Sequence, residues 1–344
     1  MLKPFRLIQG SAIAALIIGA CIPAFADGEV NVYTTREPGL IQPLLETFSK
    51  ETGIKANVIY IKEGLAQRVE TEGANSPADL LSVVDYGNLV ELVDRGLTQP
   101  VQSAVLDEGI PANLRDPKGE WFGLSMRARV IYASKDRITD EKLTYEDLAD
   151  PRFKGKVCIR SGQHPYNTSL VAAMIAKDGE EATKAWLTGV RDNLARKAGG
   201  GDRDVARDIL AGICDIGVGN SYYVGLMRSG KGGPDQVKWG EAIRVILPTF
   251  KDGAGTHVNI SGAAVAKNAP NRENAVKLLE FLASPEAQEI YAKANFEYPV
   301  RPGVAADPII AALGTLTVDP TPLAEIAKER VRASELAEAV AFDG

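Results

Sequence analysis

The stretch EVNVYTTREPGLIQPLLETFSKETGIKANVIYI, residues 29–61, decides the fold. Glu29 to Tyr33 is a short apolar run typical of a strand, and Leu40 to Thr52 carries apolar residues at helical spacing. Gly53 stands where a helix ends, and Ile54 to Ile61 follows as a second apolar run. A strand, a helix and a second strand in this order predict a parallel sheet flanked by helices.

The same alternation continues to Gly96 and begins again after Trp121, where 122–134 is a long extended stretch. Two units of this kind predict a two-lobed α/β protein in which each lobe is a mostly parallel sheet flanked by helices. We expect the amino-terminal lobe at 27–128 plus about 260–303 and the carboxyl-terminal lobe at 129–259 plus about 304–344. Ligands bind beyond the carboxyl ends of such strands, so the cleft between the lobes is the expected site. The other predicted elements are helices at 65–72, 89–95, 145–149, 169–177, 180–188 and 205–211, and strands at 79–84, 157–160, 214–218, 241–247 and 258–266.

The first 26 residues are typical of an export signal. Two basic residues precede an apolar run at 12–20, and Ala24-Phe25-Ala26 is the pattern of small residues after which a signal peptidase cuts. We therefore expect a mature chain that begins at Asp27. The alternative is a lipoprotein that carries its lipid on Cys21.

The net charge argues against nucleic-acid binding, and the cysteine content indicates a disulfide. Removal of residues 1–26 deletes two positive charges and moves the formal net charge from −6 to −8. An acidic exported protein is unsuited to nucleic acid, which needs a basic face. Cys158 and Cys214 then remain, and in an oxidising compartment an even pair is typical of a disulfide. The alternative is two buried free thiols.

Histidine is scarce, because the chain has only two. That number excludes a histidine-rich zinc or copper site. The C-x-x-C, G-x-x-x-x-G-K-[ST], G-x-S-x-G and H-E-x-x-H motifs are absent as well. No nucleophile with a paired base can be assembled convincingly, which disfavours an enzyme.

Three tyrosines follow predicted strands. Tyr222 and Tyr223 come after the run 213–219, and Tyr166 comes shortly after the strand at 157–160. One interpretation is ordinary packing, with each ring half-buried and its hydroxyl hydrogen-bonded. The other is a hard trivalent cation held by phenolate oxygens. Ionising a phenol at neutral pH costs about 4 kcal/mol, and only a strong Lewis acid such as ferric iron offsets that cost for three of them.

Segments spread over nearly the whole mature chain resemble the bacterial periplasmic ferric-iron-binding proteins. These are the transferrin-like type II substrate-binding proteins that feed ABC importers. The paired tyrosines and the N-x-E-Y-P-V tail are specific, whereas SPAD is common to many exported binding proteins. The segments are NVYTTREP (31–38), SPADLL (76–81), NSYY (220–223), HVNISGA (257–263) and SPEAQEIYAKANFEYPV (284–300).

The resemblance implies that Tyr166, Tyr222 and Tyr223 are the Fe(III) ligands, with Tyr166 on the loop after its strand. Some members add a histidine or a His-Tyr pair from the loop after the first strand, but here that loop reads TTREP (34–38). The sequence therefore resembles the three-tyrosine branch, in which a synergistic carbonate completes the coordination of the iron.

In that branch, arginines at positions that resemble Arg36 and Arg127 hold the carbonate or bicarbonate, because the guanidinium fork matches a bidentate oxyanion. The alternatives are a surface charge for Arg36 and a hinge salt bridge for Arg127. Arg129 is a weaker candidate in the same MRAR stretch.

Three further residues are candidates for positions behind the ligands. Asp85 and Glu63 follow predicted strands. Each either accepts hydrogen bonds near the cleft, is a metal ligand in one of the lobe arrangements, or is an ordinary solvated carboxylate. His164 precedes Pro165 and is expected in a loop, where it orients the segment with Tyr166.

The sequence thus predicts a monomeric periplasmic protein without catalytic activity. It captures Fe(III) and delivers the iron to the membrane permease of an ABC transporter. The alternative keeps the fold but makes the cargo a small organic or inorganic anion, clamped by Arg36 and Arg127.

Overall fold

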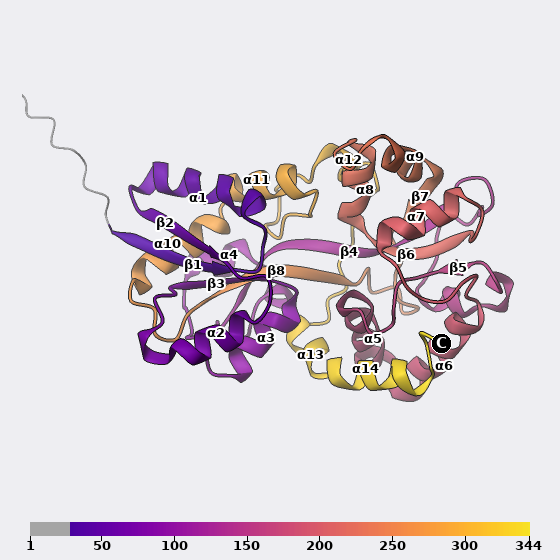
Figure 1. The fold of residues 1–344 in the computed structure, drawn as a ribbon, viewed down its shortest axis with the longest axis horizontal. Coiled ribbons are helices and arrows are strands. Elements are labelled where there is room, and N and C mark those ends of the chain that lie inside the picture. The colour runs from indigo at the N-terminus through magenta and orange to yellow at the C-terminus, as the bar shows by residue number, and fades with distance from the viewer. Residues whose placement is uncertain (1–27) are drawn as a thin grey trace, which may run out of the picture.

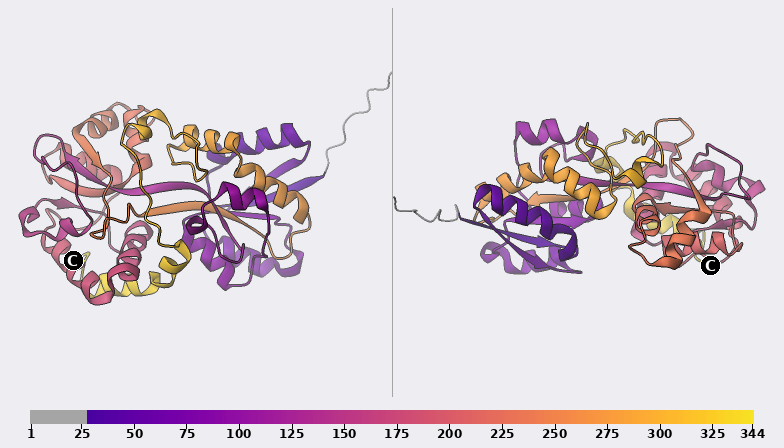
Figure 2. Two further views of the ribbon diagram at one scale, coloured as in Figure 1. Left: turned by 180° about the vertical axis from the view of Figure 1, so that it is seen from behind. Right: turned by 90° about the horizontal axis from the view of Figure 1, so that it is seen from above.

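The computed structural model describes residues 28–344. The predicted signal peptide and Cys21 lie outside the described residues, so the two predictions about them stay predictions. Within 28–344, no helix is long and apolar enough to cross a membrane. Two lobes lie side by side, and the long strands β4 (Phe122–Ser134) and β8 (Val258–Val265) run from one to the other (Figure 1). Figure 2 shows the same two lobes from behind and from above.

The amino lobe is built around β1 (Glu29–Thr34), which lies between β2 (Lys55–Tyr60) and β3 (Leu80–Val84) and runs parallel to both. β3 pairs antiparallel with the crossing strand β8. Gly53 ends the first helix in the left-handed conformation, as the sequence predicts. The helical elements of this lobe are α1 (Pro38–Thr52), α2 (Leu65–Glu72), η1 (Gly73–Asn75), α3 (Tyr86–Asp94), α4 (Ala104–Gly109), η2 (Ala112–Leu114), α10 (Arg272–Leu282) and α11 (Pro285–Asn295).

The carboxyl lobe repeats the plan with a smaller sheet. β5 (Val157–Cys158) runs parallel to β6 (Ile216–Asn220), and both β6 and β7 (Ile243–Ile246) pair antiparallel with β4. Each lobe therefore has several strands that run in one direction and one crossing strand that opposes them. The helical elements are η3 (Glu146–Ala149), η4 (Pro151–Phe153), α5 (Pro165–Asp178), α6 (Glu180–Asp192), α7 (Asp202–Leu210), α8 (Ser221–Arg228), α9 (Pro234–Ala242), α12 (Pro308–Ala311), α13 (Leu323–Lys328) and α14 (Arg330–Ala339).

The end of the chain connects the lobes a third time. α10 and α11 pack against α1 of the amino lobe, whereas α12 packs against α8 and α14 against α5 of the carboxyl lobe. α13 contacts both α5 and α3, so it lies where the two lobes meet. The crossing strands and this returning segment fix how the two sheets face one another.

Most predicted elements are confirmed, and two have the strand or helix bounds that periodicity gives, 65–72 and 122–134. The disulfide is confirmed as well, with the Cα atoms of Cys158 and Cys214 5.9 Å apart. The predicted strand at 157–160 is too long, because only two residues pair. The helix predicted to begin at Ser169 begins at Pro165, since proline is favoured in the first turn of a helix.

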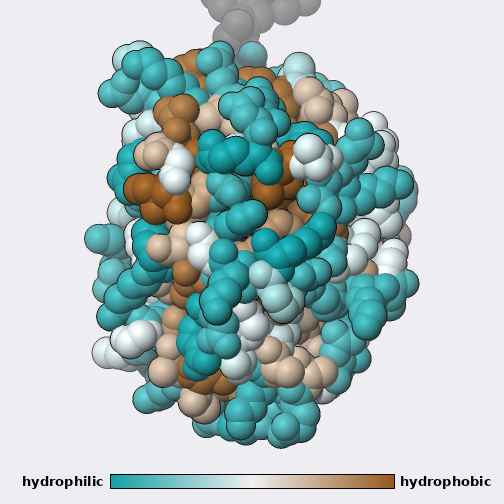
Figure 3. Space-filling view, turned by 90° about the vertical axis from the view of Figure 1, so that its right-hand side faces the viewer, coloured by the Kyte–Doolittle hydropathy of each residue, from teal (hydrophilic) through white to brown (hydrophobic). Residues whose placement is uncertain are grey.

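The far end of the carboxyl lobe is largely hydrophilic, with hydrophobic residues in small separate patches (Figure 3). Large apolar side chains that are exposed are scattered singly among the described residues, as on most globular surfaces. The informative surface is therefore the cleft between the lobes.

Candidate functional site

Tyr222 and Tyr223 lie in the first turn of α8, directly after β6. β6 is buried along its whole length because it lies between β4 and β5. Its glycines permit close packing: a Cβ on Gly219 would lie 2.3 Å from the ring of Tyr132, whose hydroxyl donates to the carbonyl of Asn220 at 2.7 Å. This contact fixes the end of β6 and therefore the point where both tyrosines leave the sheet.

Tyr166 reaches the same edge from the neighbouring strand. Because β5 and β6 are parallel, the segments that follow them emerge at one edge of the sheet. The expectation that Tyr166 lies in a loop is wrong, because it sits in the first turn of α5, after Pro165. His164 lies just outside the helix, as predicted, and its Nδ1 accepts the backbone N–H of Tyr166 at 3.2 Å. Burial lowers the pKa of His164 to about 4, which keeps the imidazole neutral for this role.

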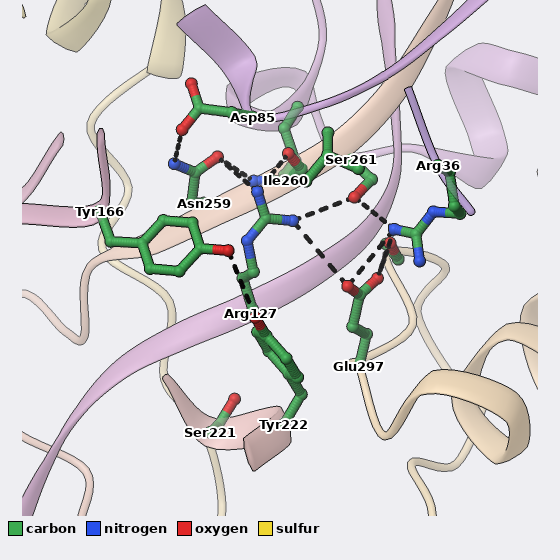
Figure 4. A network of polar contacts seen from close by, with 12 residues as sticks. Arg36, Asp85, Arg127, Tyr166, Ser221, Tyr222, Asn259, Ile260, Ser261 and Glu297 are labelled. Atoms are coloured by element: carbon green, nitrogen blue, oxygen red, sulfur yellow. Dashed lines mark hydrogen bonds and ion pairs between the residues drawn. The ribbon is translucent and has the colours of Figure 1, made fainter. Parts of the chain in front are cut away.

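The structure brings the three predicted tyrosines together. The hydroxyl oxygens of Tyr166 and Tyr222 lie 3.3 Å apart, and Figure 4 shows the two side chains pointing toward one another from separate helices. The rings of Tyr222 and Tyr223 have centroids 4.1 Å apart. Within residues 28–344, no group of three His, Cys, Asp or Glu side chains could hold a metal ion. The three phenols are therefore a cluster of oxygen donors at this edge of the sheet.

Burial makes the phenols of Tyr222 and Tyr223 hold their protons. It raises the pKa of Tyr222 well above 10, and the neighbouring Tyr166 and Tyr223 raise it further. Burial and Tyr166 raise the pKa of Tyr223 in the same way. A hard cation would reverse these shifts, because it stabilises the phenolate directly. Neighbouring phenolates that repel one another favour a cation of high charge.

Positive charge surrounds the ring of Tyr166. The guanidinium carbons of Arg127, Arg129 and Arg160 lie 5.8, 5.9 and 5.0 Å from its centroid. Arg129 and Arg160 share the buried carboxylate of Asp202, at 2.7 and 3.2 Å. One carboxylate for two arginines leaves a net positive charge beside the ring of Tyr166.

A second pair of arginines shares the carboxylate of Glu297. Arg36 follows β1 and Arg127 lies in β4, and both are buried. The carboxylate oxygens of Glu297 accept from Nη2 of Arg36 at 3.0 and 3.3 Å, and one lies 3.9 Å from Nη1 of Arg127. Both arginines also donate to the hydroxyl of Ser261, as Figure 4 shows. Nε of Arg127 is a buried donor without a hydrogen-bond partner in the described structure.

A cleft of about 210 Å³ lies between the two lobes at this point. Its lining includes Arg36 and Glu297 from the amino-lobe side and Tyr222 and Leu226 from α8 of the carboxyl lobe. Arginine, carboxylate and phenol therefore face one space between the lobes.

Residues 75–311 match the family of bacterial extracellular solute-binding proteins. The chain belongs to this family. Iron uptake protein A2 of Synechocystis is 44% identical over 319 residues, which cover 91% of this chain and 90% of that protein. The structure of a Bordetella ferric binding protein is 62% identical, with a TM-score of 0.89, and covers 92% of this chain and 100% of that one. A Trichodesmium protein, solved in complex with iron and citrate ligands, is 41% identical, with a TM-score of 0.88 and the same shares covered.

The other predicted residues of this solute-binding protein lie further from the phenols. Asp85 accepts from the side chain of Asn259 at 2.8 Å and pairs with Arg330 of α14. Asn259 in turn accepts from Arg127 at 3.4 Å, which links Asp85 to the site through one residue. Glu63 lines a different pocket, beside Lys62 and Asn88 among others.

Arg129 belongs to the carboxyl lobe alone. Besides its ion pair with Asp202, it donates to the side-chain oxygens of Asn220 at 3.1 Å and Asn167 at 2.6 Å. Arg129 therefore supports the helices that carry the tyrosines, and it does not share the partners of Arg36.

Sequence reasoning missed three polar residues of the solute-binding site, Glu297, Ser261 and Asp202. All three are at least nine-tenths buried. Glu297 and Ser261 lie in segments that carry the family resemblance, so their polarity inside otherwise apolar runs was a usable signal. Asp202 opens α7 and gave no such signal, since acidic residues are common in the first turn of a helix.

Proposed function

We propose that this chain is a periplasmic ferric-iron-binding protein that captures Fe(III) and delivers it to the permease of an ABC importer. The observation that carries the proposal is the convergence of Tyr166, Tyr222 and Tyr223 in the cleft. The names of the similar proteins, which are iron uptake and ferric binding proteins, support the same cargo.

The three phenols fit ferric iron as cargo. Each would bind as a phenolate, and ferric iron is the common biological cation that is hard enough and charged enough to displace their protons near neutral pH. The guanidinium carbons of three arginines lie 5.0 to 5.9 Å from the centroid of the Tyr166 ring, so positive charge stands beside one of the proposed ligands. Reduction to Fe(II) would weaken binding, because a lower charge stabilises phenolates less.

Three phenolates leave about three positions of an octahedral Fe(III) to other donors. We propose that carbonate or bicarbonate takes part of them, held by Arg36 and Arg127. The buried Nε of Arg127, which lacks a hydrogen-bond partner in the described structure, supports an anion next to the phenols. The Trichodesmium relative was solved with citrate, so the anion can differ among relatives.

The remaining parts of the proposal concern the whole protein. We place it in the periplasm as a monomer exported by a cleaved signal peptide, and we assign it no catalytic activity. The lobe boundaries 27–128 plus about 260–303 and 129–259 plus about 304–344 are supported by the packing of α10 and α11 on α1 and of α12 and α14 on the carboxyl lobe. Closure of the lobes would bring Arg36 and the tyrosines around one ion.

Colour is the test. Phenolate bound to Fe(III) absorbs visible light by charge transfer, so purified protein loaded with ferric iron and bicarbonate is expected to be coloured and to bleach with dithionite. A Tyr223→Phe variant, which keeps the ring, should lose intensity and shift the band. A protein that stays colourless with one equivalent of Fe(III), yet binds phosphate tightly, would instead be the small-anion carrier that the arginine pair also permits.

A further inference from the structure

Glu297 occupies the place between the two arginines to which the proposed function assigns the anion. Its side chain is 7% exposed, and its oxygens accept from Arg36 and from the hydroxyl of Ser125. Arg127 lies 3.9 Å from the same carboxylate. The chain therefore supplies one anion of its own at this point.

This carboxylate leaves the cluster with one net positive charge. Arg36 and Arg127 contribute two positive charges and Glu297 one negative charge, while Ser261 and Ser125 are neutral. Arg127 still has an unused buried donor, and Arg36 lines the cleft.

Asp85 is the next carboxylate, linked to Arg127 through Asn259. Its negative charge is neutralised by an ion pair with Arg330, so it does not repel an anion at Arg36 and Arg127. Glu37 also lines the cleft, but it is exposed to solvent, which screens its charge. Glu297 is therefore the buried carboxylate that an entering anion meets at the arginines.

We propose that Glu297 determines the charge of the anion that binds together with the iron. It admits a singly charged anion such as bicarbonate and disfavours multiply charged anions such as phosphate. The physical reason is repulsion between like charges a few ångströms apart beside buried side chains, and this repulsion grows with each charge on the anion. This inference rests on the proposed function, because that function places the anion at Arg36 and Arg127.

A Glu297→Gln variant isolates the charge. The amide keeps the length of the side chain and one acceptor oxygen for Arg36, while the negative charge is removed. Asp208→Asn is the matched control, because Asp208 is also buried and shared by two arginines, Arg196 at 2.7 Å and Arg207 at 3.0 Å. Both variants change the net charge by the same amount.

The experiment is a calorimetric titration of iron-free protein with phosphate and, separately, with bicarbonate. Relative to wild type, Glu297→Gln is expected to bind phosphate at least about ten-fold more tightly, with a smaller gain for bicarbonate. Asp208→Asn should match wild type for both. The proposal is overturned if the ratio of phosphate to bicarbonate affinity in Glu297→Gln equals that of wild type, even if both affinities fall. Glu297 would then only position Arg36.

A Glu297→Asp variant separates charge from shape and serves if Glu297→Gln does not fold. It retains the carboxylate, so its ratio of phosphate to bicarbonate affinity should stay at the wild-type value. A ratio that moves toward phosphate in Glu297→Asp would contradict the proposal. Failure of the proposed function is seen separately, as the absence of a visible charge-transfer band with ferric iron, and it leaves the anion titrations readable.

Discussion

Replacing Tyr222 by phenylalanine removes the hydroxyl that lies 3.3 Å from that of Tyr166 and keeps the ring that stacks on Tyr223. A phenol ionises near pH 10, so each tyrosine that becomes a ligand releases one proton at neutral pH. Burial raises the pKa of Tyr222 further, so its proton is bound until iron arrives. Wild type is expected to release about three protons per iron from these ligands, and Tyr222→Phe about two.

The sign and size of the pH dependence follow from this count. Because binding releases protons, affinity for Fe(III) falls as the pH falls. The loss is about 1,000-fold per pH unit for three protons and about 100-fold for two. The advantage of wild type over Tyr222→Phe therefore shrinks about ten-fold for each unit of acidification. Protonation of the anion affects both proteins alike, so the difference of one proton does not depend on which anion binds.

Competition with a ferric chelator of known stability, between about pH 6 and pH 8, measures these slopes. Proton release into a weakly buffered solution measures the count directly. Tyr298→Phe is the control, because the buried hydroxyl of Tyr298 has no hydrogen-bond partner in the described structure and is not among the proposed ligands. It should release as many protons as wild type. If Tyr222→Phe also does so, Tyr222 is not a phenolate ligand and the three-tyrosine site is refuted.

Three other perturbations have expected outcomes. Gly225→Ala should weaken iron binding. The added Cβ would lie 2.3 Å from the ring of Phe296, so α8, which carries Tyr222 and Tyr223, must shift. Competition with a ferric chelator measures the loss of affinity. Reducing the Cys158–Cys214 disulfide, which spans 56 residues, should lower the free energy of unfolding by about 4 kcal/mol in urea titrations. Burial lowers the pKa of His257 from its usual 6.5 to about 4. The unfolded chain therefore takes up a proton before the folded protein does, and the free energy of unfolding falls by about 3 kcal/mol as the pH drops from 6.5 to 4. His257→Asn should unfold with a shallower acid dependence.

Each of these outcomes can fail in a recognisable way. Unchanged iron affinity in Gly225→Ala would show that α8 moves without displacing its tyrosines. A reduced protein as stable as the oxidised one would mean that the disulfide does not restrict the unfolded chain. An acid dependence of unfolding that is the same with and without the imidazole would remove His257 as its cause.

The elements and the tyrosines could be predicted from sequence because their signals are local. Alternating strands and helices of ordinary length give the lobes, and a strand followed at once by two tyrosines places those rings at a sheet edge whatever the rest of the chain does. The start of α5 was misplaced although its local signal was present: Pro165 holds His164 in an extended conformation, as expected, and it also stands in the first turn of a helix that His164 caps.

The partners of the arginines could not be predicted, because they are set by long-range contacts. Arg36 meets Glu297 across 261 residues: Arg36 follows β1, whereas Glu297 stands next to Tyr298, which pairs with Met126 of the crossing strand β4. Arg127 and Arg129 lie two residues apart in one strand, yet one bonds at the hinge and the other in the carboxyl lobe. No periodicity in the sequence separates those two environments.

Among residues 28–344, two clusters next to the candidate site have the same composition, two arginines and one buried carboxylate. They consist of Arg129, Arg160 and Asp202, and of Arg36, Arg127 and Glu297. A buried charge that is not fully matched costs stability, so a fold selected for stability alone would match each arginine. The first cluster lies against the ring of Tyr166, and Arg36 and Glu297 of the second line the cleft. Under the proposed function, each cluster would receive a negative charge, a phenolate in one case and an anion in the other. Binding of iron together with the anion would place a negative charge at both clusters and offset the cost of burying unmatched arginines in each. Binding of only one component would offset that cost in one cluster. This difference favours closure around the complete set of metal, phenolates and anion.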